Sequence, residues 1–156
     1  MKKLNILFVI VFLFYACHDT SNTNQFVVTI DAVIKKTDSI NIYYTEDNLI
    51  NFDDNNSLWT KLEGDLKNQT IQIVLPEKIK PTQLRIDFGK NINNQEIVLN
   101  KICFTYLESS FEAKGEEIYW YFRPDENNTT LDKKNGVLKR KNPNQLNGPS
   151  IYPKGN

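Results

Sequence analysis

The chain has 156 residues, of which 40% are hydrophobic and 12% aromatic, and its formal net charge is zero. This apolar content excludes an intrinsically disordered chain, and the length suffices for one domain with a hydrophobic core. The charge is divided unevenly, because residues 17–131 hold 11 Lys and Arg against 18 Asp and Glu, whereas residues 132–156 hold six against one. Such a basic segment can contact phosphate-rich surfaces, but a solvated tail is the favoured interpretation.

The first residues have the pattern of a signal peptide. Lys2 and Lys3 precede the almost wholly apolar segment 4–16. A helix of that length reaches about 20 Å, which is short of the ~30 Å hydrocarbon core of a membrane. A charged start, a short apolar segment and a small residue at its end are typical of signal peptides.

Residues 14–17 read Phe-Tyr-Ala-Cys and resemble the lipobox of bacterial lipoproteins. The resemblance implies a signal peptide over 1–16, acylation of Cys17, and a lipidated tether over 17–25 that anchors the protein in membrane lipid. No acidic residue directly follows Cys17, so the outer membrane is favoured over the inner one, with the leaflet open. Nucleic acid is not an expected partner there. An ordinary signal peptide with a coincidental cysteine and an uncleaved anchor remain as alternatives.

Runs of β-branched and aromatic residues, bounded by Asn, Asp, Gly and Pro, predict a series of short strands. These strands are expected at 26–34, 39–45, 58–62, 70–75, 84–88 and 97–107. In the last run the apolar face shifts phase between Leu99 and Ile102, which predicts a β-bulge at Asn100-Lys101. Helical periodicity is almost lacking, so the fold class expected is an all-β, antiparallel, jelly-roll-like sandwich with at most one short helix.

The sandwich domain is expected over 26–125, followed by a polar, basic C-terminal extension over 126–156. Residues 115–122 suit a short helix or a strand equally in composition, and two acids in the first turn favour the helix. Within the extension, Asn135-Gly136 predicts a small hairpin over 129–140. Residues 142–156 are expected to be irregular, either lying extended on the domain or hanging free.

The stretch 75–102 contains the run Leu84-Arg85-Ile86-Asp87-Phe88-Gly89-Lys90-Asn91. It resembles a segment of jelly-roll modules in bacterial envelope proteins, similar to carbohydrate-binding-like and galactose-binding-like domains. The likeness covers about residues 70–125. It implies a sandwich first and a glycan ligand second, because the motif describes a strand, a turn and a bulged strand.

Catalytic chemistry is not expected. The sole histidine of the sequence, His18, lies in the tether, so a Ser-His-Asp or Cys-His site cannot form within one chain. With Cys17 acylated, Cys103 has no disulfide partner and is expected to be a buried structural thiol. Adjacent acids such as Asp53-Asp54 suit solvated turns better than a glycosidase pair. A carboxylate-based hydrolase is the less favoured alternative, and no cofactor is expected.

A metal site is not expected either, although one loop is rich in oxygen ligands. Asp47, Asp53 and Asp54 are weak calcium candidates, because calcium binds hard oxygen ligands on flexible loops. In a calcium-loop pattern that starts at Asp53, however, Leu58 stands at the glycine position and Gly64 at the position of the bidentate glutamate. A polar surface loop is therefore the favoured interpretation.

Sugar-binding modules present aromatic faces beside polar groups, and several residues could serve in this way. The candidate ligand-binding residues are Arg85, Asp87, Asn91, Tyr119 and Tyr121. The two tyrosines would be exposed if 118–122 were a strand. Tyr43, Trp59 and Trp120 are further aromatic candidates, but both tryptophans are expected in the core, because large aromatics dominate sandwich interiors.

Asp38-Ser39-Ile40 resembles the acceptor sequence for periplasmic O-glycosylation, which makes Ser39 a candidate modification site. Together the patterns predict a lipid-anchored, non-catalytic binding module for a glycan or another envelope component. The alternative is a scaffold lipoprotein that docks on a membrane protein through an apolar patch or the basic tail.

Overall fold

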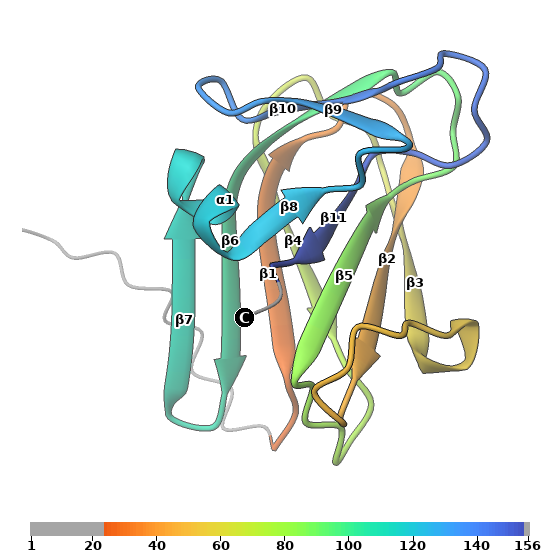
Figure 1. The fold of residues 1–156 in the computed structure, drawn as a ribbon. Coiled ribbons are helices and arrows are strands. Elements are labelled where there is room, and N and C mark those ends of the chain that lie inside the picture. The colour runs from red at the N-terminus through yellow and green to blue at the C-terminus, as the bar shows by residue number, and fades with distance from the viewer. Residues whose placement is uncertain (1–23, 155–156) are drawn as a thin grey trace, which may run out of the picture.

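The computed structural model describes residues 24–154, which form two antiparallel β-sheets packed face to face (Figure 1). The elements in chain order are β1 (Val27–Val33), β2 (Asp38–Thr45), η1 (Asp54–Asn56), β3 (Ser57–Leu62), β4 (Gln69–Val74), β5 (Gln83–Phe88), β6 (Glu96–Tyr106), β7 (Ser109–Lys114), η2 (Gly115–Glu117), α1 (Ile118–Tyr121), β8 (Phe122–Pro124), β9 (Thr129–Asp132), β10 (Val137–Arg140) and β11 (Ser150–Pro153). The predicted all-β sandwich with one short α-helix is confirmed.

The first sheet has the strand order β4-β1-β6-β10-β9, and β7 also pairs with β6. Strand β6 is 11 residues long, so its first residues pair with β10 and its second half pairs with β7. The second sheet has the order β3-β2-β5-β11-β8. Strand β7 and the 3-10 turn η1 lie where the sequence pattern predicts no regular structure. Segment 109–114 offers only Phe111 and Ala113 as alternating apolar residues.

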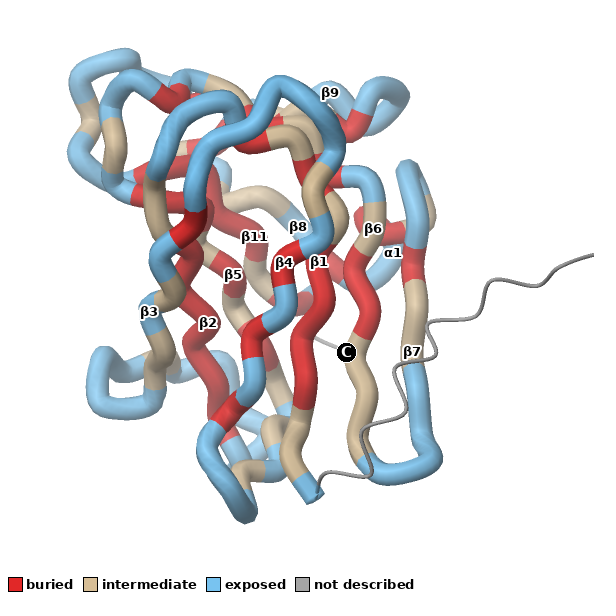
Figure 2. Tube along the Cα trace, turned by 180° about the vertical axis from the view of Figure 1, so that it is seen from behind, coloured by how far each residue is buried: buried red, intermediate tan, exposed pale blue. Residues whose placement is uncertain are grey.

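The core is built from alternate residues of both sheets. In β5, Leu84, Ile86 and Phe88 point inward and are buried, and they alternate with the half-buried Arg85 and Asp87. Figure 2 shows that β1 and β2, inside their sheets, are buried along most of their length, whereas the edge strands β3 and β4 are partly exposed. Burial of one such Ile or Leu side chain stabilises the fold by about 1.5–3 kcal/mol.

The bulge in β6 lies where the phase shift predicts it. Asp31 of β1 is opposite Lys101, whereas the next residue, Ala32, is opposite Leu99. Asn100 is therefore the extra residue, and its Nδ2 donates to Asn68 Oδ1 at 2.7 Å. The bulge keeps the apolar side chains on both sides of it directed into the core.

Residues 126–154 do not form a separate extension, in contrast to the expectation from the sequence for 126–156. Strands β9 and β10 form the predicted hairpin, but the hairpin belongs to the first sheet, and β11 lies between β5 and β8 in the second. Leu138 and Ile151 are fully buried. The strands are four residues long, and the apolar residues that face the core are few: the half-buried Leu131 in β9, the buried Leu138 in β10, and the buried Ile151 and Pro153 in β11. These are too few for a recognisable alternation.

A buried arginine joins this C-terminal part to the rest of the domain. Arg140 is 6% exposed, and its guanidinium donates to four backbone carbonyl groups. The acceptors are the oxygens of Asn91 at 3.0 Å, Asn94 at 2.9 Å, Gln145 at 2.7 Å and Asn147 at 2.6 Å. A positive charge within the basic segment is thus structural rather than available to a partner.

The predicted helix at 115–122 is present as η2 followed by α1. Since the segment is helical, its side chains do not alternate as in a strand: Tyr119 is 1% exposed, whereas Trp120 is 68% and Tyr121 46% exposed. The expectation that Trp120 fills the core is wrong, because Ile118 and Tyr119 occupy the inward side of this short helix.

Among residues 24–154, no helix has the length and apolar character needed to cross a membrane. The predicted signal peptide and the predicted lipidation site Cys17 lie outside the described residues. Cys103 is fully buried in β6, as expected.

Replacement of Ile86 by Ala should lower the free energy of unfolding by about 2–5 kcal/mol, because it leaves a cavity in the central strand of the second sheet. Urea denaturation of the full chain measures this change. Val74→Ala, at a side chain that is 44% exposed, should cost less than about 1 kcal/mol. Equal effects of the two variants would contradict the assignment of the core.

Replacement of Arg140 by Met should lower the free energy of unfolding by about 2–4 kcal/mol, because four carbonyl groups lose their donor. The exposed Lys134 offers a matched control, and Lys134→Met should change stability by less than about 0.5 kcal/mol. Thermal unfolding compares the two variants. An unchanged melting temperature for Arg140→Met would show that these four hydrogen bonds do not stabilise the fold.

Candidate functional site

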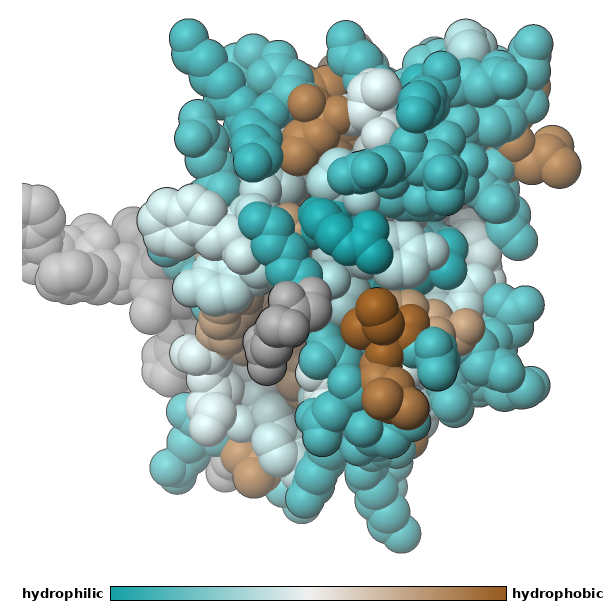
Figure 3. All heavy atoms as spheres, viewed as in Figure 1, coloured by the Kyte–Doolittle hydropathy of each residue, from teal (hydrophilic) through white to brown (hydrophobic). Residues whose placement is uncertain are grey.

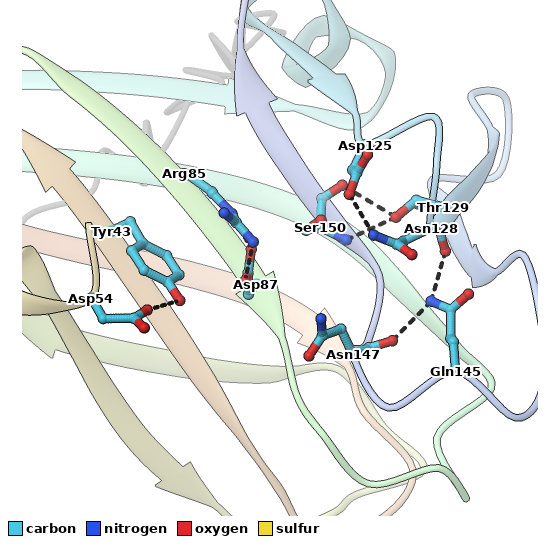
Figure 4. A network of polar contacts seen from close by, with 10 residues as sticks. All are labelled: Tyr43, Asp54, Arg85, Asp87, Asp125, Asn128, Thr129, Gln145, Asn147 and Ser150. Atoms are coloured by element: carbon cyan, nitrogen blue, oxygen red, sulfur yellow. Dashed lines mark hydrogen bonds and ion pairs between the residues drawn. The ribbon is translucent and has the colours of Figure 1, made fainter. Parts of the chain in front are cut away.

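A polar hollow of about 600 Å³ lies on the outer face of the second sheet, over strands β3, β2 and β5. We call it the β5 basin. It is lined by Tyr43, Asp54, Ser57, Trp59, Arg85, Asp87, Gly89, Lys90 and Asn147. The basin unites residues distant in sequence because antiparallel pairing sets Tyr43 opposite Arg85. Figure 4 shows these two side chains with Asp87 and Asp54.

The centre of the basin is an ion pair between Arg85 and Asp87. Arg85 Nε donates to Asp87 Oδ1 and Arg85 Nη2 donates to Oδ2, each at 2.7 Å. The guanidinium also stacks between two rings, 4.6 Å from the centroid of Tyr43 and 4.7 Å from that of Tyr152. A bidentate, stacked arginine has little freedom to move. The pair therefore presents a rigid polar surface.

Burial raises the pKa of Asp87 above its ordinary value, and the hydrogen bonds and charge of Arg85 offset only part of this effect. Burial also disfavours the charged form of Arg85, but the hydrogen bond and charge of Asp87 exceed it, so the pKa of Arg85 is raised. The guanidinium thus stays charged at any physiological pH.

Tyr43 forms one wall of the basin and holds the neighbouring loop in place. Its hydroxyl donates to Asp54 Oδ1 at 2.8 Å. Burial, followed by this hydrogen bond, raises the pKa of Tyr43 to about 12. Phe52 packs edge-on against Tyr43 and Tyr152, with ring centroids 6.5 and 5.9 Å apart. The loop before β3 is thereby fixed against the sheet.

Trp59 forms another wall, and its expected place in the core is wrong. The side chain is 39% exposed because Leu58, its neighbour in β3, is the residue that packs against the core. Lys90 Nζ lies 4.3 Å from the centroid of the Trp59 ring. An exposed cation–π contact of this kind contributes about 0.5–1 kcal/mol, so the lysine can be displaced from the ring.

The basin is held from its other side by the C-terminal segment. Asn147 lines the hollow, and its carbonyl oxygen accepts hydrogen bonds from Arg140 and from Gln145 Nε2. Gln145 Nε2 also donates to the oxygen of Asn128, whose Nδ2 donates to Asp125 Oδ2 (Figure 4). The buried Arg140 thus supports both the fold and the rim of the basin.

Between Trp59 and Asp87 lies an asparagine that the sequence reasoning missed. Asn41 of β2 pairs with Trp59 on one side and with Asp87 on the other. It is 0% exposed, yet within residues 24–154 neither Oδ1 nor Nδ2 has a hydrogen-bond partner. A buried amide without partners costs about 1–3 kcal/mol, and such groups are rare in folded proteins. The signal in the sequence is a polar residue between Ile40 and Ile42 in a central strand.

The remaining ligand candidates do not join the basin. Asn91 lies in the loop after β5. Its Nδ2 donates to the backbone carbonyl oxygen of Thr37, and its own backbone carbonyl oxygen accepts from Arg140 Nη2. Tyr119 is buried and Tyr121 lines a different hollow. Of the five predicted residues, the fold therefore brings only Arg85 and Asp87 together in the β5 basin.

The loop after Gly89 takes its shape from the half-buried carboxylate of Asp38. Asp38 Oδ1 accepts from the backbone N–H groups of Ser39, Lys90 and Asn91 at 2.9 to 3.1 Å. Gly89 has a φ of +84°, and a Cβ on it would lie 2.2 Å from the Asp38 side chain. Glycine is therefore required here, and it directs Lys90 over Trp59. The glycosylation candidate Ser39 is half-buried at the start of β2.

The three calcium candidates bind different groups. Asp47 Oδ1 accepts from the N–H of Leu49, Asp53 Oδ1 accepts from the N–H of Asn55, and Asp54 binds Tyr43. Over the described part of the chain, no three His, Cys, Asp or Glu side chains gather in a group that could hold a metal ion.

No family model matches the sequence, and comparisons with curated proteins and with solved structures find no match.

Two buried asparagines allow a test of the unpartnered amide. Asn41→Leu should leave the free energy of unfolding unchanged or raise it by about 1 kcal/mol, because it removes polar atoms that have no partner. Asn94, 3% exposed, exchanges hydrogen bonds with Lys36 and Asp38, so Asn94→Leu should lower it by about 2–4 kcal/mol. Urea denaturation distinguishes the variants. A large loss for Asn41→Leu would show that the amide is satisfied in the folded protein.

Proposed function

We propose that the protein is a lipid-anchored, non-catalytic lipoprotein of the cell envelope whose β5 basin binds a glycan. The observation that carries the proposal is the buried amide of Asn41, which lies without partners between an exposed tryptophan ring and an ion pair. The amide is 0% exposed and lies beneath the lining of the basin, so a ligand reaches it only when the side chains that cover it shift. A ligand that both donates and accepts hydrogen bonds would then satisfy it. Sugar hydroxyl groups do both.

The walls of the basin suit the remaining surfaces of a sugar. The apolar C–H face of a pyranose can stack on Trp59 once Lys90 moves aside, since that contact is weak. Asp87 carboxylate oxygens retain acceptor capacity beyond the two bonds from Arg85. The charges of Arg85 and Asp87 cancel, so the basin favours a neutral or weakly charged glycan.

The basin offers little support for the alternative functions. Asp87 is bound to Arg85 and Asp54 is bound to Tyr43, so neither carboxyl group is placed as an independent acid or base. A scaffold that docks through its basic tail could not use the charge of Arg140, because that residue is buried. The face seen in Figure 3 is largely hydrophilic with small, separate apolar areas.

The location of the protein follows from the sequence pattern. The lipobox-like residues before Cys17 favour acylation of that cysteine and attachment to the outer membrane. In Figure 1 the described chain enters β1 at the end of the sandwich opposite the β9–β10 hairpin. A tether from that end would leave the outer face of the second sheet open to a ligand beside the membrane.

The test uses the full chain in micelles of a detergent without sugar groups, titrated against a panel of envelope polysaccharides. Wild type should bind at least one polysaccharide, and Asn41→Leu and Trp59→Ala should each weaken that binding about tenfold or more. Trp120→Ala is the matched control, since Trp120 is exposed but lies outside the basin, and it should bind as wild type does. No binding across the panel, or unchanged binding by both basin variants, would refute the proposal.

A further inference from the structure

A second hollow, of about 460 Å³, lies between the β6–β7 end of the first sheet and strands β5 and β11 of the second. We call it the aromatic cavity. Its lining residues are Phe26, Pro81, Thr82, Gln83, Leu84, Phe104, Tyr106, Ser109, Ser110, Phe111, Tyr121, Phe122, Pro153 and Lys154. In Figure 1, β7 stands at the edge of the first sheet beside β6, with α1 at its upper end. Its size is within the range of small-molecule sites.

The wall of this cavity is a cluster of rings in mutual contact. The ring of Phe104 lies 5.7 Å from that of Phe26, 5.5 Å from Phe111 and 6.3 Å from Phe122, and Phe111 lies 4.8 Å from Tyr121. Phe104 and Phe111 are only half-buried. An apolar ligand that covers such surface gains roughly 25 cal/mol per Å² of area removed from water.

A third hollow, of about 800 Å³, adjoins the aromatic cavity and shares Phe122 and Lys154 with it. Its lining is partly apolar and also carries the cationic residues Arg123, Lys133 and Lys154 and the acids Glu126 and Asp132. We call it the polar hollow for these charged groups. The guanidinium of Arg123 lies over the ring of Tyr152, 5.3 Å from its centroid. Asp132 already accepts hydrogen bonds from the backbone and side chain of Asn135. Within residues 24–154 none of the three cationic side chains forms an ion pair with a carboxylate.

Tyr119 contributes an unsatisfied donor to the same polar hollow. The residue is 1% exposed, and its hydroxyl has no hydrogen-bond partner among the described residues. Burial raises the pKa of Tyr119 far above neutrality, so the phenol keeps its proton. A buried O–H donor that lines the same hollow as Lys133 and Lys154 is suited to an anionic group.

We infer that the aromatic cavity and the adjoining polar hollow form one site for a long-chain carboxylate, with its acyl chain among the rings and its head group at Lys154. The shared position of Lys154 sets the boundary between the apolar and the cationic part. The charge of Lys133 and the Tyr119 hydroxyl extend the anion-binding side. This site is distinct from the β5 basin and does not depend on glycan binding.

The test is native mass spectrometry of the full chain released from detergent micelles after titration with oleate or with monoolein, which has the same acyl chain and a neutral head. Wild type should form a one-to-one adduct with oleate and bind monoolein about two- to fivefold more weakly. Lys154→Gln should remove that difference. Lys67→Gln, at an exposed lysine of another loop, should preserve it.

A plug variant tests the cavity itself. Ser109 lies two residues before Phe111 in β7, so both side chains are on the cavity face of that strand. Ser109→Trp should weaken binding of both lipids at least about tenfold, because the indole ring would fill the space that the acyl chain needs. Thr130→Trp, on the exposed side of β9, should bind as wild type does, and so should Asn41→Leu and Trp59→Ala. Absence of an oleate adduct, its persistence in Ser109→Trp, or equal oleate and monoolein binding by wild type would overturn the inference.

Discussion

The two-residue alternation of β5 is the constraint on which most of this molecule depends. One face of the strand supplies Leu84, Ile86 and Phe88 to the core, and the other supplies Arg85 and Asp87 to the basin. Because the period of a strand is two, a slip of one residue would exchange these faces. The partners on both sides prevent such a slip: β2 pairs along the whole strand, and β11 pairs with its second half. The core and the β5 basin therefore depend on the same register of strand pairing.

The C-terminal segment has a larger part in this register than its polar composition indicates. Strand β11 lies between β5 and β8 in the second sheet. The buried guanidinium of Arg140 binds carbonyl groups of both the loop 91–94 and the segment 145–147, and so holds the two together. Asn147, held in this way, lines the β5 basin. A single buried charge is tolerated because every one of its bonds goes to a backbone carbonyl oxygen.

Two buried polar side chains without hydrogen-bond partners lie close to the hollows described above. Asn41 lies under the β5 basin and Tyr119 lines the polar hollow beside the aromatic cavity, and neither has a hydrogen-bond partner within residues 24–154. Each carries a cost to stability. Tyr119 lines its hollow directly, whereas Asn41 lies beneath the lining of the β5 basin.

The sequence by itself determined the elements whose pattern is local. Alternation predicted six strands close to β1 through β6, the phase shift predicted the bulge at Asn100, and the acids after Gly115 predicted the short helix. The outward direction of Arg85 and Asp87 also followed from alternation, which is why these two candidates meet in the basin. A hydrogen-bond ladder between neighbouring residues leaves its mark in a short window of sequence.

Only the tertiary structure decided which faces became core and which side chains met. Trp59 is outside because Leu58 faces inward, Tyr119 is inside because its segment is helical, and Asn91 supports a loop rather than a ligand site. Asn41 lies between Trp59 and Asp87 because of strand pairing across the second sheet. Two of the four carbonyl groups that bind Arg140 are 46 and 49 residues away in sequence. Such pairings depend on the packing of two whole sheets, and no local pattern of residue types encodes them.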